Sequence, residues 1–153
     1  MATDRNGLEI LTRSECFDLL KTARLGRIAL SVAALPVVLP VNFAMFDNDV
    51  LIRTTTGSKL EAAATNAVVG FEVDRVDDTD RLGWSVLVQG MASEITGPDE
   101  LDRARQMPLE PWTGHDGHYL RIATRLISGR RLSLPIHDDH CQPPDESSPL
   151  RPS

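Results

Sequence analysis

The stretch that decides the fold runs from residue 36 to residue 55 and reads PVVLPVNFAMFDNDVLIRTT. Its two prolines exclude a helix interior, and the apolar and β-branched residues around them favour extended strands. The triplet Asp47-Asn48-Asp49 is typical of a tight turn. We therefore expect two antiparallel strands, over residues 36–46 and 50–55, joined by a hairpin at Asp47.

The flanking sequence has the same short-strand character. Four further strands are expected, over residues 27–32, 67–76, 84–95 and 118–127. Three short helices are expected, over residues 12–23, 58–64 and 98–106. The first begins with a capping-box pattern, in which Glu15 follows Thr12 by three positions. Many short strands without regular strand-helix alternation predict a mainly β chain, folded as an antiparallel barrel with short helices.

Length and composition indicate one ordinary globular domain. A domain of 153 residues buries roughly 70% of its unfolded surface, which is enough for a single hydrophobic core. We expect a flexible N-terminal arm over residues 1–11 and the barrel over residues 12–134. The tail over residues 135–153 is rich in Pro, Asp and Ser, and we expect it to be disordered.

Net charge and cysteine content restrict the partners and the cellular location that we expect for this chain. The formal net charge of -6 argues against nucleic-acid binding, which depends on clustered Lys and Arg. The sequence lacks both a membrane-length apolar run and the layout of a secretion signal, so no membrane association is expected. With only two cysteines and no disulfide framework, we expect a cytoplasmic location.

The segment RTTTGSKL, residues 53–60, carries the clearest chemical signal. It runs from a strand end through Gly57 into a helix start and brings together two cations and four hydroxyls. Helix N-terminal amides, hydroxyls and Arg together suit a bound phosphate. The alternative is that Ser58 merely caps a helix while Arg53 and Lys59 are solvated. The residue order differs from that of a nucleotide P-loop.

Taken in order, several short motifs resemble the pyridoxamine-phosphate-oxidase-like, flavin-binding split-barrel superfamily. Within it they are most similar to the small bacterial group related to nitroimidazole reductases. The motifs are Leu25-Gly26-Arg27-Ile28-Ala29, Pro36 with Pro40-Val41-Asn42-Phe43, Arg53-Thr54 with Gly57-Ser58-Lys59-Leu60, Phe71-Glu72-Val73-Asp74, Gly83-Trp84-Ser85-Val86 with Val88 and Gly90, Arg121-Ile122 and Gly129-Arg130-Arg131. The resemblance covers roughly residues 10 to 132.

The resemblance implies a six-stranded antiparallel split β-barrel that forms a homodimer, with flavin mononucleotide (FMN) sites across the subunit interface. It implies that Arg53, Thr54, Thr55, Ser58 and Lys59 hold the flavin phosphate. It also implies that Pro40, Val41 and Asn42 lie along the ring, and that Trp84 approaches from the partner subunit. Without the resemblance, Trp84 reads equally as a core or dimer-contact aromatic.

Other side chains leave alternatives open. Trp112 lies in a Pro- and Gly-rich loop, where it would cover a pocket or simply pin the loop. His115 and His118 would donate a proton or bind haem, or would be ordinary surface residues. The cluster His137 to Cys141 lacks a second paired group, and no metal site is expected.

The leading functional hypothesis is an FMN-dependent oxidoreductase that acts on a small, electron-poor substrate such as a quinone or a nitro compound. A flavin performs the electron transfer itself, so an obvious catalytic dyad is not required. The alternatives are a non-enzymatic flavin or haem binder, a deazaflavin-coenzyme protein and a cofactor-free dimer. A deazaflavin tail would need a basic groove, for which the candidates are Arg121, Arg125, Arg130 and Arg131.

Overall fold

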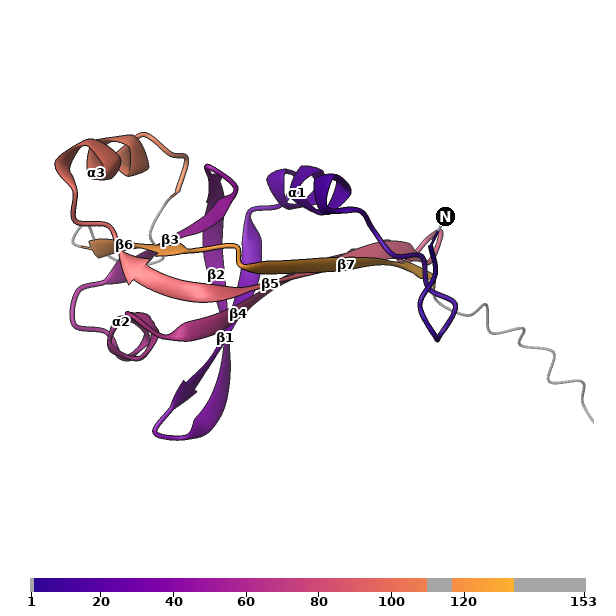
Figure 1. The fold of residues 1–153 in the computed structure, drawn as a ribbon, viewed down its shortest axis with the longest axis horizontal. Coiled ribbons are helices and arrows are strands. Elements are labelled where there is room, and N and C mark those ends of the chain that lie inside the picture. Colours follow the sequence, from indigo (N-terminus) through magenta and orange to yellow (C-terminus); the bar gives the residue numbers. More distant parts are fainter. Residues whose placement is uncertain (1, 110–116, 134–153) are drawn as a thin grey trace, which may run out of the picture.

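The computed structural model describes residues 2–109 and 117–133. In these residues seven strands and three helices follow one another (Figure 1). The strands are β1 (Leu25–Val32), β2 (Leu35–Phe46), β3 (Asp49–Thr55), β4 (Val68–Val76), β5 (Leu82–Glu94), β6 (Gly117–Ile122) and β7 (Leu126–Ser133). The helices are α1 (Arg13–Lys21), α2 (Lys59–Ala64) and α3 (Pro98–Arg105). Within the described ranges, no helix is long and apolar enough to cross a membrane.

Six strands close into an antiparallel barrel in the order β4-β1-β2-β3-β6-β5, with β5 pairing back to β4. The long strand β5 makes this closure possible. Along one edge it pairs with β4, while its other edge meets β7 through residues 82–89 and β6 through residues 92–94. The expected six-stranded antiparallel split barrel is therefore confirmed, with β7 as an added strand.

The prediction of one strand over residues 118–127 is wrong. The chain forms β6 and β7 in succession along the same edge of β5, with a break between Ile122 and Leu126. At the break Thr124 turns away to the β2–β3 hairpin, where its amide donates to Asp49 Oδ1 at 2.9 Å. A Cβ on Gly90 of β5 would overlap the carbonyl oxygen of Ala123, so the break also needs a glycine opposite it. The local sequence contains no signal that predicts these tertiary contacts.

Two tight turns shape the hairpins. The hairpin predicted at Asp47 is confirmed, with Asp47 and Asn48 in the left-handed region at φ 49° and 63°. The β1–β2 hairpin turns through Ala33 and Ala34, at φ 49° and 65°. Asn and Asp tolerate this conformation, whereas in alanine it carries a steric cost.

The core fills the barrel with the inward-facing side chains of every strand. Its largest fully buried residues include Phe71, Leu20, Ile28 and Leu120. The Phe71 ring packs edge to face against Phe43 at 4.9 Å between centroids. Helix α1 adds Cys16, Phe17 and Leu20 to this core, and the capping box predicted at Thr12 and Glu15 is confirmed. A smaller apolar cluster lies under α3.

The described part of the N-terminal arm, residues 2–11, lies against β7. Ile10 forms a β-bridge with Arg130, and Leu11 is buried. Asp4 pairs with Arg130 at 3.2 Å and Glu9 pairs with Arg131 at 3.3 Å. These contacts tie the arm to the end of the barrel opposite α2 and α3 (Figure 1).

Candidate functional site

A cavity of about 830 Å³ opens at the barrel end where β3, β6 and the end of β5 meet α3. Its lining combines two arginines, a histidine, a glutamate and several uncharged residues. The lining residues are Arg53, Thr56, Glu94, Ile95, Thr96, Leu101, Arg105, Gly117, His118 and Tyr119. Of the residues predicted to bind a cofactor, Arg53 lines this cavity. We call it the Arg53 cavity.

Arg53 is positioned by the pairing of β3 with β6. Arg53 lies opposite Tyr119 in the ladder, and its guanidinium carbon is 5.6 Å from the centroid of the Tyr119 ring. A Cβ on Gly117 would come within 3.2 Å of Arg53 Nε, so the arginine uses space that only a glycine leaves open. The guanidinium is therefore held between an aromatic face and a bare strand end.

The three threonines that follow Arg53 lie in different environments. Thr54 is 4% exposed, and its hydroxyl donates to the carbonyl oxygen of His118 at 3.3 Å, inside the β3–β6 ladder. Thr55 and Thr56 are exposed, and Thr56 lines the cavity. Alternation along β3 explains why Thr54 points away from the face of Arg53, because successive side chains point to opposite faces; Thr56 follows the end of the strand.

At the start of α2, Ser58 is the N-cap and its hydroxyl accepts from the amide of Glu61 at 3.1 Å. The Glu61 carboxylate in turn accepts from the amide of Gly57 at 3.2 Å, so a side chain of this chain already occupies part of the helix terminus. Lys59 is exposed beside it. The capping alternative for Ser58 is thus observed, and the phosphate role of Ser58 and Lys59 stays a prediction.

His118 joins two carboxylates at the rim of the cavity. Its Nδ1 lies 2.7 Å from Glu61 Oε1 and 3.2 Å from Glu94 Oε1. The hydrogen bond to Glu61 raises the pKa of His118 above its usual value, although partial burial opposes this shift. The sequence singled out His118 but not its partners. The Ser58-x-x-Glu61 spacing was a signal for Glu61, whereas Glu94 and Arg105 reach the cavity only through the tertiary fold.

The residues predicted to lie along a flavin ring take three different environments. Val41 points into the core at 8% exposure, and Pro40 lies exposed on the outer face opposite Arg27. Asn42 lines a smaller cavity of about 300 Å³ beside Arg24. It directly precedes Phe43, which pairs with Ile52, the residue before Arg53. Asn42 therefore comes from the part of β2 nearest to Arg53.

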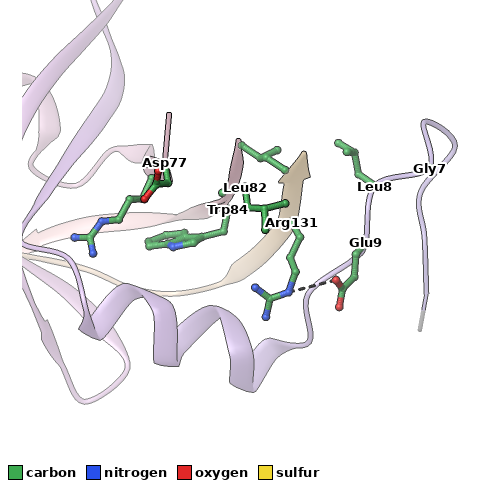
Figure 2. Close-up of a pocket in the computed structure, with 10 residues that line it drawn as sticks. Gly7, Leu8, Glu9, Asp77, Leu82, Trp84 and Arg131 are labelled. Atoms are coloured by element: carbon green, nitrogen blue, oxygen red, sulfur yellow. Dashed lines mark ion pairs between the residues drawn. The ribbon is translucent and has the colours of Figure 1, made fainter. Parts of the chain in front are cut away.

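Trp84 lies far from Arg53 within one chain. Ten residues separate it from Glu94 along β5, which corresponds to roughly 30 Å at the rise of an extended strand. It is 8% exposed, belongs to the core cluster and borders a separate cavity of about 490 Å³. Figure 2 shows the arm residues Gly7, Leu8 and Glu9 on one side of that cavity, with Arg131 reaching toward Glu9. We call it the Trp84 cavity.

The basic residues proposed for a deazaflavin tail do not form one groove. Arg121 is held near α3 by Asp49 at 2.6 Å and by Glu100. Arg130 and Arg131 lie at the other end of the barrel, paired with carboxylates of the arm.

Some predicted positions have no described structure. Trp112, His115 and the cluster His137 to Cys141 lie outside the described residues. In residues 2–109 and 117–133, no group of three or more His, Cys, Asp or Glu side chains could hold a metal ion.

A profile of the pyridoxamine 5'-phosphate oxidase family matches residues 12–131, which is most of the barrel and its first helix. The chain belongs to this family. The match starts at the cap of α1 and ends within β7, so every element that forms the Arg53 cavity lies inside the family region.

Individual relatives agree with the family assignment. The chain is 40% identical to the FAD binding protein of Mycobacterium smegmatis, with a TM-score of 0.74, covering 81% of this chain and 99% of that one. It is 25% identical to an FAD-binding protein of Mesorhizobium loti, with a TM-score of 0.65, covering 82% and 99%. It is also 36% identical over 128 residues to the uncharacterized protein Rv0080 of Mycobacterium tuberculosis, covering 80% and 84%.

Proposed function

We propose that this chain binds a flavin nucleotide as a homodimer and uses it as an oxidoreductase toward a small, electron-poor substrate such as a quinone or a nitro compound. The observation that carries the proposal is the Arg53 cavity, in which two arginines line a space large enough for a phosphorylated ligand. Two similar solved structures are of proteins named for FAD binding, which supports the choice of a flavin.

The residues of the Arg53 cavity fit a phosphate group. Arg53 and Arg105 approach from β3 and α3, and an arginine binds two phosphate oxygens at once. Thr56 and Thr96 add hydroxyl donors. Arg53 and Arg105 would hold the phosphate, and Tyr119 would orient Arg53 through the contact of its ring with the guanidinium. A bound flavin supplies hydride and electron transfer, so this chain has to bind, orient and shield it.

A second copy of the chain is needed to bring Trp84 to such a ligand, because the Arg53 cavity lies at the Glu94 end of β5 and Trp84 lies near its other end. The outer face of the barrel offers an apolar surface for that copy. It exposes Val38, Val68, Met91 and Leu126, which are 51–68% exposed. The register places Val68 beside Met91, and places Leu126 beside Gln89 on the adjoining strand. Contiguous apolar side chains of this kind mark protein interfaces.

The cofactor would be FMN by the sequence resemblance, and FAD by the names of the two solved relatives. The shared chemistry is a phosphate bound in the Arg53 cavity. Within one chain Arg121 lies far from Arg130 and Arg131, so a basic groove for a deazaflavin tail would have to be formed across the proposed dimer.

The proposal is tested by the visible absorption spectrum of the purified protein after incubation with excess FMN or FAD and removal of unbound ligand. Retained flavin bands, followed by oxidation of a nicotinamide donor when a quinone or nitro acceptor is added, would agree with it. Retained flavin without turnover would support flavin binding but contradict the oxidoreductase activity. A haem-like band, or no chromophore after both incubations, would overturn the flavin assignment.

A further inference from the structure

The Arg53 cavity has two carboxylates in or beside it that a phosphate site does not require. Glu94 lines the cavity, and Glu61 lies directly behind His118. The Glu61 carboxylate is held at the start of α2 by the Gly57 amide. The backbone of Glu94 is fixed at the end of β5, where it pairs with Leu120. Two carboxylates next to a phosphate site would repel the ligand unless something offsets them.

We propose that His118 is the positioning residue that offsets them: its imidazolium bridges Glu61 and Glu94, so that a phosphate meets Arg53 and Arg105 with the carboxylate charge cancelled. This inference rests on the proposed function, because it assumes a phosphate-bearing flavin in the Arg53 cavity. His118 acts on the ligand through the two carboxylates and through its charge.

The geometry supports a charge-balancing role. One imidazole nitrogen lies within 3.2 Å of both carboxylates, and the side chains of Glu61 and Glu94 are only 17% and 35% exposed. The other charged or titratable side chains that line the cavity are Arg53 of β3, Arg105 of α3 and Tyr119 of β6. Arg105 also pairs with Asp102 of α3 at 3.3 Å. With His118 protonated, the three cations balance the three carboxylates; with His118 neutral, the carboxylates are in excess and the attraction for a phosphate weakens.

A purely structural role for His118 would give a different result. If His118 only tied α2 to the sheet, removing either end of the bridge would loosen the site and weaken binding. If it balances charge, the two substitutions act in opposite directions: His118→Gln leaves two uncompensated carboxylates, whereas Glu94→Gln removes one of them and leaves the imidazolium to help the arginines. Whether Glu94→Gln tightens or weakens FMN binding therefore distinguishes the two roles.

The experiment measures the dissociation constants of FMN and of riboflavin, which lacks the phosphate, for the wild-type protein, H118Q, E94Q and the double variant. At pH 6.5, FMN binding should weaken about fivefold to tenfold in H118Q and tighten by a similar factor in E94Q, the size expected of one charge a few ångströms away at a partly exposed site. The double variant should lie between them. Riboflavin affinity should not change, because riboflavin carries no phosphate.

A pH series supplies a second readout. The ratio of FMN dissociation constants between H118Q and the wild-type protein should fall toward one as the pH rises and His118 loses its proton, whatever the phosphate itself does. Weaker FMN binding by E94Q, a ratio independent of pH, or equal effects on riboflavin would overturn the role of His118. A wild-type protein that retains no FMN or FAD would instead overturn the proposed function, and this inference with it. Circular dichroism verifies that each variant folds.

Discussion

The guanidinium carbon of Arg53 lies 5.6 Å from the centroid of the Tyr119 ring, with the two residues opposite each other on β3 and β6. This pairing directs a cation into the Arg53 cavity. We therefore expect Arg53→Gln to weaken FMN binding about 30-fold or more, since a charge-assisted bidentate contact is worth about 2–3 kcal/mol. Equilibrium titration of flavin fluorescence measures this loss of FMN affinity. The control is Arg125→Gln, an exposed arginine outside the cavity, and an equal loss in both variants would contradict the assignment.

Gly117 provides a test of how tightly Arg53 is held. A Cβ at this position would lie 3.2 Å from Arg53 Nε and would overlap the carbonyl oxygen of Thr54. Gly117→Ala should lower the free energy of unfolding by about 1–3 kcal/mol and should also weaken FMN binding. Gly97→Ala is the control for steric overlap, because a Cβ there would meet nothing within 4 Å. Gly97 is the N-cap of α3, so a stability loss in this variant reports helix capping, and its FMN binding should not change. Urea denaturation and flavin titration measure the two effects, and unchanged FMN binding by Gly117→Ala would argue that the position of Arg53 is unimportant.

The β1–β2 turn stores strain that can be removed. Ala33 and Ala34 both have positive φ, which costs an L-residue with a Cβ roughly 1–2 kcal/mol. The double substitution Ala33→Asn with Ala34→Gly introduces the preferred residue pair for this turn. It should raise the free energy of unfolding by about 1 kcal/mol after the entropy cost of glycine. Asn48→Ala, at φ 63° in the other hairpin, should act in the opposite direction. Urea denaturation compares these two variants with the wild-type protein, and a destabilised double variant would contradict the turn geometry.

Glu72 makes stability depend on pH. Burial and the neighbouring Asp74 raise the pKa of Glu72 from 4.5 to about 7, although Arg27 opposes the shift. Because the folded state holds this proton more tightly than the unfolded state does, Glu72 should lower stability as the pH rises from 4.5 to 7. Glu72→Gln mimics the protonated side chain, so it should match the wild-type protein near pH 4.5 and exceed it at pH 8, by about 1 kcal/mol for a side chain one-third exposed. Denaturation curves at the two pH values test this, and a Glu72→Gln protein less stable at pH 8 would contradict it.

The apolar outer face predicts the assembly. Met91→Glu places a charge beside Val68 on the proposed subunit contact and should shift the protein from dimer to monomer, whereas Met91→Leu should keep the dimer. Light scattering after size-exclusion chromatography gives the mass of each species. A monomeric wild-type protein would contradict the proposed dimer. A dimeric Met91→Glu protein would place the interface elsewhere.

Local sequence signals predicted most of the fold. The cap at Thr12, the turn at Asp47 and the helix start at Ser58 each depend on a few adjacent residues, and all three are observed. The division between β6 and β7 was missed because it depends on Gly90 and Asp49, which are distant in sequence. The site follows the same rule: Arg53 was predicted, whereas Glu94, Arg105 and Tyr119 converge on it only when β5, α3 and β6 pack together.

The proposed function depends most on one flavin site being completed by Arg53 of one subunit and Trp84 of the partner subunit. The decisive measurement is the flavin content of a mixed dimer of Arg53→Gln and Trp84→Leu subunits, purified through two different C-terminal tags. Each homodimeric variant should retain little FMN, whereas the mixed dimer should retain about one flavin per dimer, because one of its two sites keeps both native residues. A mixed dimer as empty as the two parents, or a Trp84→Leu homodimer that binds FMN as the wild-type protein does, would contradict a site shared between subunits.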